Sequence, residues 1–274
     1  MPPMTSTSTT GRGRARRHPP ELWRVPVLRT GLVTPRMARI TVGGDALATF
    51  PGGGGDQHVV LYFYQPDVAL PDPLTLVSAR TLLGQVRPAM RSYTVRRYDP
   101  ATHELDIDFV LHGDTGVASA WAMAAGPGDD MILVGPSPAY LPDPDVPRHL
   151  LAGDETALPA IGAMLAGLPP TAAVTVLIEV ADAAEQQPLP GPPGTEVRWL
   201  HRDGHPAGTP DLLLPAVRSA AVSGDDSAVW AAGERTVMQA VRAHLLDDRG
   251  LERRRVRTTM YWRHGQAGTG ATGG

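Results

Sequence analysis

Arg91-Ser92-Tyr93-Thr94-Val95-Arg96 lies in the first half of this 274-residue chain and places a guanidinium, an aromatic ring and two hydroxyls in one predicted strand. On a strand, Arg91 and Tyr93 share one face while Ser92 and Thr94 share the other. A guanidinium suits a pyrophosphate because its donors fork to two oxygens, a ring can stack on a flat ligand, and a hydroxyl can bond a ring nitrogen. The stretch therefore meets three needs of a flavin nucleotide, although an ordinary exposed cross-strand pair has the same spacing.

Short segments rich in Val, Ile, Tyr and Thr surround this stretch, and Gly, Pro and Asp separate them. We expect strands at residues 23–28, 36–42, 58–64, 91–98, 104–111 and 130–135. A short helix at residues 116–124 interrupts them and begins with small residues. Six strands and one helix predict a small antiparallel β-barrel, which we assign to residues 21–142.

The pattern of apolar residues changes after a proline-rich segment. Near-continuous apolar runs at residues 149–152, 174–180, 197–200, 228–232 and 256–261 alternate with helical patterns, notably at 156–165 and 235–246. Such runs are typical of strands covered on both faces, so the alternation predicts a doubly wound, Rossmann-like parallel α/β domain at residues 148–265. The GxGxxG fingerprint is absent after its first strand. We expect disordered tails at residues 1–20 and 266–274.

The composition excludes several chemistries. All 25 Lys+Arg residues are Arg, and the chain contains no Lys, Cys or Asn. A Schiff-base lysine, a P-loop of the GxxxxGK[ST] kind, a cysteine nucleophile, a disulfide and a thiolate metal site are therefore all excluded. Redox chemistry would need an organic cofactor or a metal held by oxygen and nitrogen.

Charge and hydropathy limit the partners. The net charge of −3 shows no basic excess, so we expect no nucleic-acid partner. No run of 18 uncharged apolar residues occurs, and no apolar segment follows Arg16-Arg17, so we expect no membrane partner, no export and a cytoplasmic location. We also expect a monomer.

The order of barrel, RxYT strand, glycine loop and α/β domain is similar to that of the ferredoxin-reductase-like flavoproteins. Within that group the chain resembles the siderophore-interacting proteins, which are FAD-dependent ferric-siderophore reductases, over about residues 23–265. Four stretches in order give the resemblance: residues 91–96; Asp108-Phe109-Val110-Leu111-His112-Gly113 with residues 116–122; residues 153–161; and Trp230-Ala231-Ala232-Gly233-Glu234 followed by Tyr261-Trp262-Arg263-His264-Gly265. It implies an FAD-binding barrel and an NAD(P)H-binding α/β domain.

The resemblance also implies the FAD site. Arg91 would hold the pyrophosphate, Tyr93 would stack on the isoalloxazine, and Thr94 would lie near its N5 atom. His112 would sit beside the ribityl and phosphate chain, and the helix start after Gly116 would offer unpaired N–H groups to an anion. The implied FAD-binding residues are Arg91, Ser92, Tyr93, Thr94, Asp108, Val110, His112, Gly116, Val117, Ala118 and Ser119.

For the nicotinamide nucleotide, the resemblance implies two loops at strand ends. Thr156 would cap a helix that faces the phosphates, while Asp154 and Glu155 would serve in capping and ribose contact. The choice between NADH and NADPH stays open, because Arg198, Arg202 and Arg235 could each accept a 2′-phosphate. The implied residues are Gly153, Asp154, Glu155, Thr156, Ala232, Gly233 and Glu234.

The substrate implied by the resemblance is an anionic ferric siderophore. One or two of the arginines around the last predicted strand, with Arg254, Arg255 and Arg263 as the candidates, would line a basic pocket for it, since Coulomb attraction raises encounter rates. A solvated charged face is the alternative. The chain departs from the family's usual pattern at Val60, where Lys is frequent, and at Met260, where Gly is frequent. NAD(P)H would reduce FAD, and FAD would then reduce iron(III) with no catalytic side chain and no resident metal.

Three other functions stay open at this point. One is a flavin reductase of the same architecture with another acceptor, such as a ferredoxin-type partner or a quinone. Another is a protein that binds a ferric siderophore without reducing it. The third is a two-domain protein in which the 91–96 strand is only structural.

Overall fold

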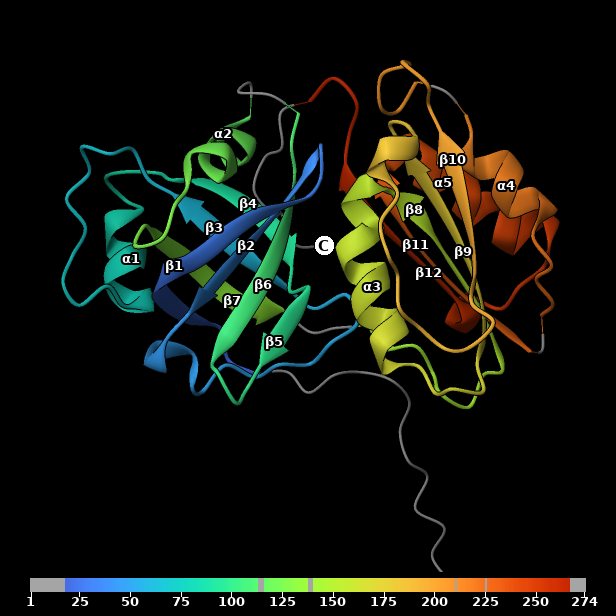
Figure 1. Ribbon diagram of the computed structural model, residues 1–274, viewed down its shortest axis with the longest axis horizontal. Helices are drawn as coiled ribbons and strands as arrows, with labels where there is room; N and C mark the ends of the chain where they lie inside the picture. Colours follow the sequence, from blue (N-terminus) through green and yellow to red (C-terminus); the bar gives the residue numbers. More distant parts are fainter. Residues whose placement is uncertain (1–17, 113–115, 138–139, 210, 225, 267–274) are drawn as a thin grey trace, which may run out of the picture.

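The computed structural model describes residues 18–112, 116–137, 140–209, 211–224 and 226–266 (Figure 1). The predicted tails 1–20 and 266–274 fall mostly outside these residues, as does Gly113 of the second motif. The chain folds into a seven-stranded antiparallel sheet followed by a five-stranded parallel sheet with helices on both faces. This confirms the prediction of a β-barrel followed by a Rossmann-like α/β domain.

The first sheet contains β1 to β7 in the order β4-β3-β7-β1-β2-β6-β5. β1 is long because its first half pairs with β7 and its second half turns away to pair with β2. Two helices accompany the sheet, α1 (Leu76–Leu82), which we did not predict, and α2 (Val117–Ala124), which we did. The strands are β1 Glu21–Thr34, β2 Met37–Gly43, β3 His58–Phe63, β4 Ala89–Thr94, β5 Arg97–Asp99, β6 Glu104–Val110 and β7 Asp130–Ser137.

The predicted strand at residues 91–98 is two strands, which is why the sheet has seven strands and not six. Between β4 and β5 the chain crosses from one edge of the sheet to the other. The Val95 N–H donates to the Gln57 carbonyl at 2.8 Å, and the Arg96 N–H donates to the Asp106 carbonyl at 2.9 Å. These two bonds link the β3 side to the β6 side, so the crossing closes the barrel.

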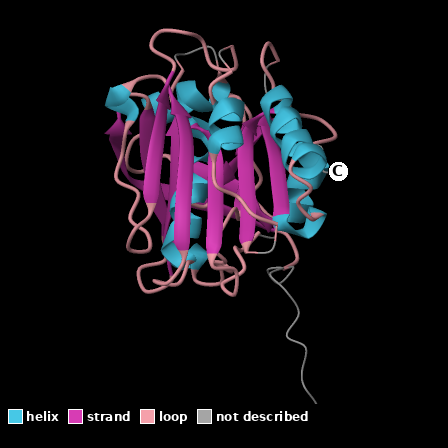
Figure 2. Cartoon of the chain, turned by 90° about the vertical axis from the view of Figure 1, so that its right-hand side faces the viewer, coloured by secondary structure: helices cyan, strands magenta, loops and turns pink. Residues whose placement is uncertain are grey.

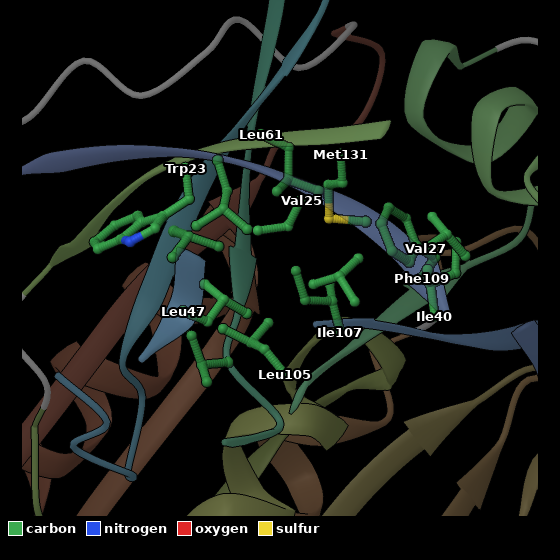
Figure 3. Packing of buried hydrophobic residues seen from close by; sticks show 14 of the residues in the cluster. Trp23, Val25, Val27, Ile40, Leu47, Leu61, Leu105, Ile107, Phe109 and Met131 are labelled. Atoms are coloured by element: carbon green, nitrogen blue, oxygen red, sulfur yellow. The ribbon is translucent and has the colours of Figure 1, made fainter. Parts of the chain in front are cut away.

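The barrel interior is filled by side chains from nearly every strand. Figure 3 shows Leu61, Ile107 and Met131 pointing toward one another from three different strands. In β3, buried Val59, Leu61 and Phe63 alternate with half-exposed residues, which is the pattern of a strand with one face on a core. The alternation visible in the sequence therefore identifies the inner face of the barrel.

The second sheet contains β8 to β12, all parallel, in the order β10-β9-β8-β11-β12 (Figure 2). Its central strands are buried along almost their whole length, as their continuous apolar runs predicted. α3 lies on the side facing the barrel, and α4 and α5 cover the other face (Figure 1). The elements are β8 Arg148–Asp154, α3 Leu158–Gly167, β9 Ala173–Val180, β10 Glu196–His201, α4 Leu213–Ser219, β11 Ser227–Glu234, α5 Arg235–Ala243 and β12 Val256–Trp262.

Contacts between the barrel and the α/β domain are polar as well as apolar. Buried Glu185 accepts a hydrogen bond from the Thr34 hydroxyl at 2.6 Å. Asp56 accepts from the Trp230 indole at 3.1 Å, and Met37 of β2 packs in the core of the α/β domain. Because buried polar groups are paired across it, the interface fixes how the two domains face each other. Among the described residues, no helix is long and apolar enough to cross a bilayer.

Candidate functional site: a flavin and nucleotide cleft

Strand β4 carries an arginine that has no acidic partner among the described residues. The Arg91 guanidinium donates to the Met90 carbonyl at 2.8 Å, and no carboxylate of the described residues lies within 4.0 Å of it. Arg39 in contrast is held by both oxygens of Asp108, at 2.7 and 2.8 Å. A half-buried guanidinium without an acidic partner is suited to bind an anionic ligand.

Tyr93 and Thr94 follow on opposite faces of the same strand. The Tyr93 ring lies 4.3 Å from the ring of Phe109 at an interplanar angle of 35°, and burial raises the pKa of its phenol. Thr94 is buried, and its side chain interacts with Tyr261 of β12 in the α/β domain. Ser92 is exposed on the same face as Thr94. The RSYT strand therefore lies where the two domains meet.

The start of α2 lacks a side-chain cap. Gly116 precedes the helix without a side-chain capping hydrogen bond, and the first N–H groups of any helix lack partners within the helix. A Cβ at Gly116 would lie 2.5 Å from Cε1 of His112, so only glycine lets this imidazole lie against the helix start. The His112 N–H donates to the Ser119 hydroxyl at 3.2 Å, which ties the loop to the helix. These features form a small anion-binding cradle beside Val117 and Ala118.

The side chains of Asp108 and Val110 are already engaged, the first with Arg39 and the second against the core of the α/β domain. The Asp108 carboxylate is taken by Arg39, as described above. β6 pairs with β2 along its whole length but with β5 only over Glu104–Asp106. The other edge of residues 107–110 is therefore not paired with a strand of the described chain, which leaves main-chain groups to meet a flat polar ring.

The Asp154 carboxylate accepts hydrogen bonds from three segments of the α/β domain. One of its oxygens accepts from the N–H and hydroxyl of Thr156, and the other accepts from the Glu234 N–H at 3.1 Å and the Trp262 indole at 2.7 Å. Burial and the neighbouring Glu155 charge raise the pKa of Asp154 to about 6. Asp154, and not the predicted Thr156, is thus the cap of the turn η2 (Glu155–Ala157). It ties together the loops that follow β8, β11 and β12.

Two glycines allow this close approach at the carboxyl ends of β8 and β11. A Cβ at Gly153 would lie 2.3 Å from the Ala232 carbonyl oxygen, and one at Gly233 would lie 2.6 Å from Oδ2 of Asp154. Glu234 then caps α5 by accepting from the Val237 N–H at 3.1 Å. Ligands of open α/β sheets bind at this end of the strands. The predicted nucleotide loops therefore lie side by side.

Glu155 and Arg202 are engaged with each other. The Arg202 guanidinium donates to both oxygens of Glu155 at 2.7 Å and to Glu179 at 3.3 Å. Arg202 is only 4% exposed. Our expectation that Arg202 could accept a 2′-phosphate is wrong, because its guanidinium is already paired with the half-buried Glu155 and the buried Glu179.

The three arginines assigned to the chelate pocket do not come together. Arg254 and Arg255 precede β12, and Arg263 follows it. A strand of seven residues spans about 23 Å, so these groups lie at opposite ends of β12. Arg254 is also paired with Glu252. Of the three candidates, only Arg263 follows β12 and so lies at the end of the sheet that holds the nucleotide loops, and the three cannot line one pocket together.

Several residues at the domain boundary escaped the sequence analysis. Asp56 accepts from the Trp230 indole and from the Tyr140 N–H, the latter at 2.5 Å. Trp230 meets the ring of Tyr261 edge to face at 6.3 Å, and the neighbouring Thr259 hydroxyl is buried without a partner among the described residues. Asp56 and Trp230 are 174 residues apart, so no local pattern signals their contact.

Comparison with known proteins identifies the family. Residues 26–140 match the model of the siderophore-interacting FAD-binding domain, and residues 146–265 match that of the siderophore-interacting protein. The chain belongs to the siderophore-interacting protein family. The suspected resemblance is thereby confirmed, and FAD is the cofactor of its first domain.

Relatives with named activities cover most of the chain. It is 34% identical to the NADPH-dependent ferric-chelate reductase of Escherichia coli, over 86% of this chain and 91% of that protein. It is 30% identical to the ferric vibriobactin reductase ViuB of Vibrio cholerae, over 87% and 88%. The crystal structure of a siderophore utilization protein from T. fusca, 36% identical, superposes with a TM-score of 0.81 over 92% of this chain and 97% of that one.

The side chains fit the cofactors that the family implies. Arg91, which has no acidic partner among the described residues, and the start of α2 supply donors of the kind that the diphosphate of FAD needs. Gly153 and Gly233 leave a side-chain-free edge on the α/β domain for a dinucleotide. The buried, unpartnered Thr259 hydroxyl near Tyr261 provides a further polar atom between these two halves.

Proposed function

We propose that this chain is an FAD-dependent, NAD(P)H-driven oxidoreductase that reduces ferric siderophores and so releases iron(II). The observation that supports it best is the contact of Thr94 with Tyr261. This contact joins the barrel, with Arg91 and the start of α2, to the glycine-lined strand ends of the α/β domain. An arrangement of this kind lets a flavin meet a nicotinamide in one cleft.

Within this proposal each half of the site has a separate task. Arg91 and the α2 N–H groups hold the FAD diphosphate, Tyr93 packs along the isoalloxazine, and Ser92 and Thr94 bond its edge. Backbone of Asp108 and Val110 meets the polar side of the ring, and His112 stands by the phosphate chain with Gly116, Val117, Ala118 and Ser119. Domain limits of 21–142 and 148–265 remain our assignment.

The nucleotide loops orient the donor. Gly153, Ala232 and Gly233 keep the strand ends open, while Asp154, Glu155, Thr156 and Glu234 hold the loops in place through the contacts described above. FAD, when bound, accepts a hydride and gives up electrons one at a time. Arg263, exposed at the same edge, is the candidate contact for the anionic chelate, and Arg254 and Arg255 have no part in this step.

Reduction of the metal explains release of the cargo. Iron(III) is a hard ion that oxygen ligands favour, and iron(II) is held more weakly. No side chain need act as acid or base for electron transfer, so the protein orients donor, flavin and chelate. The proposal includes a cytoplasmic location, because reduced nicotinamide nucleotides are made inside the cell, and it includes a monomer.

An anaerobic visible spectrum tests the proposal. The purified protein is incubated with FAD, desalted, and treated first with NADH or NADPH and then with a ferric siderophore. Bound flavin that bleaches with a nucleotide and reoxidises with the chelate is the expected result. Retained flavin that ignores the chelate would assign another acceptor, and absence of flavin would refute the assignment.

Replacement of Arg91 tests the FAD contact directly. Arg91→Ala should lower the affinity for FAD at least tenfold, since a charge-assisted bidentate contact is lost. Arg24→Ala is the matched control, because Arg24 is another barrel arginine but forms an exposed ion pair with Asp130. Equal FAD affinities of the two variants would contradict the assignment of Arg91.

A further inference from the structure

A buried carboxylate joins the barrel to the middle of the parallel sheet. Oδ2 of Asp56 accepts from the Trp230 indole of β11 at 3.1 Å, and Oδ1 accepts from the Tyr140 N–H at 2.5 Å. Asp56 and Trp230 are both buried. Both donors are neutral N–H groups, and a buried carboxylate that loses one of them is left with an unsatisfied oxygen. The two bonds therefore hold Asp56 and Trp230 in one arrangement.

On the barrel side, Asp56 is anchored close to β4, the strand that we propose to hold FAD. It precedes β3 by two residues, and His58, the first residue of β3, lies opposite Thr94 in the β3–β4 ladder. Two residues span at most about 7 Å of chain. The His58 imidazole also bonds the Asp56 carbonyl at 3.3 Å. A shift of Asp56 is thus transmitted to the row of residues that contains Thr94.

On the other side, Trp230 is anchored close to the nucleotide loops. It precedes Gly233 by three residues of β11, which is about 10 Å of strand. It packs in the core on the side of the sheet that faces the barrel, and its ring meets Tyr261 edge to face at 6.3 Å. Tyr261 in turn interacts with Thr94. A series of contacts therefore leads from Asp56 through Trp230 and Tyr261 back to Thr94.

This bond complements a second polar contact of the domain interface. Thr34 of β1 donates to Glu185, which lies in the turn η3 (Ala183–Glu185) after β9. β9 and β11 are separated by β8 in the sheet, so the two contacts lie apart. A single contact leaves two domains free to rotate about it. The Asp56–Trp230 bond opposes that rotation, and it does so near both halves of the proposed cleft.

We infer that Asp56 and Trp230 are positioning residues, and that the hydrogen bond between them sets how closely the nicotinamide approaches the flavin. The inference rests on the proposed function, because that function supplies both ligands. In the step concerned, a hydride carries two electrons from C4 of the reduced nicotinamide to N5 of FAD, which leaves NAD(P)+ and the anionic reduced flavin. Its rate depends steeply on the distance between these atoms, and a displacement of about 1 Å can cost about 100-fold.

Two variants and a matched control isolate the bond. Trp230→Phe removes the indole N–H and keeps an aromatic ring against Tyr261. Asp56→Asn keeps the shape of the side chain but offers one acceptor oxygen to two N–H donors. Trp199→Phe is the control, because Trp199 is a half-buried tryptophan of the same sheet whose indole has no hydrogen-bond partner among the described residues.

Binding and hydride transfer are measured separately. Fluorescence titration of flavin-free protein gives the dissociation constants for FAD and for the nucleotide, and we expect both to stay within about twofold of wild type. Anaerobic stopped-flow absorbance gives the limiting rate of flavin bleaching, which should fall about 10- to 100-fold in Trp230→Phe and Asp56→Asn. The long-wavelength absorbance of a nicotinamide stacked on a flavin should weaken with it. Trp199→Phe should match wild type in every measurement.

Two further measurements show that the loss comes from this bond. The double variant should be no slower than the slower single variant, because both substitutions remove the same interaction. Reoxidation of the dithionite-reduced protein by ferricyanide should keep its wild-type rate, since that reaction needs no nicotinamide.

Several outcomes would overturn the inference. Bleaching at the wild-type limiting rate in both variants would show that the bond does not set the approach. An equal loss in Trp199→Phe, or a loss of FAD or nucleotide affinity that accounts for the slower reaction, would assign Asp56 and Trp230 a role in folding only. Failure of the proposed function is separate, since the wild type itself would then hold no flavin or would bleach with neither nucleotide.

Discussion

A methyl group at Gly153 has no room in this fold. Its Cβ would lie 2.3 Å from the Ala232 carbonyl oxygen and 2.4 Å from the Cβ of Ala157. Both distances are about 1 Å shorter than a favourable van der Waals contact. Neither neighbour is the end of a flexible side chain, because one is backbone of the adjacent strand and the other lies in the turn η2. β8 and β11 would therefore have to separate.

We expect Gly153→Ala to lower the free energy of unfolding by about 1–3 kcal/mol, the usual cost of overpacking a well-packed site. Gly167→Ala is the matched control. Gly167 is the last residue of α3, and nothing lies within 4 Å of an added Cβ there. Alanine is favoured over glycine in helices by up to about 1 kcal/mol, so this variant should be as stable as wild type or more stable.

Urea denaturation followed by circular dichroism measures both variants, and fluorescence titration gives their affinities for NADPH and FAD. The nucleotide affinity of Gly153→Ala should fall, while its FAD affinity should stay at the wild-type value because Arg91 and α2 lie in the other domain. Equal unfolding midpoints for Gly153→Ala and Gly167→Ala would refute the argument from close strand packing. Loss of FAD with retained NADPH affinity would refute the division of the site between the domains.

Three further variants test the buried polar groups. Burial raises the pKa of Glu179 to about 7, so the native state keeps a proton that the unfolded chain releases near pH 4.5. The free energy of unfolding should therefore fall by up to about 3 kcal/mol as the pH rises from about 4.5 to about 7. Glu179→Gln should flatten that part of the pH profile of urea unfolding. Arg202→Met leaves Glu155 and Glu179 without a cation and should lower the free energy of unfolding by about 3–5 kcal/mol at pH 8. The loss should be smaller at pH 5, because carboxylates are easier to protonate there. An equal loss at both pH values would contradict this account. Thr34→Val removes a donor to buried Glu185 and should lower the free energy of unfolding by about 1–3 kcal/mol in the same assay. Unfolding at the wild-type midpoint would show that this contact between the domains does not stabilise the fold.

The sequence by itself determines the two architectures and their order. Apolar runs at residues 149–152 and 228–232 predict strands covered on both faces, and they are the buried strands β8 and β11. The RSYT stretch predicts a strand, and its four residues lie in β4. These predictions succeed because strand and helix periodicity and glycine-rich loops are local properties of the chain. The split between β4 and β5 is not local, since it depends on which edge of the sheet each half meets.

Only the tertiary structure decides how charges and polar groups are paired. Arg202 looks free in the sequence, but the fold buries it against Glu155, 47 residues away. Asp56 meets Trp230 across 174 residues for the same reason. Arg255 and Arg263 are close in sequence, but they lie at opposite ends of β12, because an extended strand separates the residues that flank it. Distances of this kind depend on how strands from the whole chain are stacked, and a single sequence does not contain that information locally.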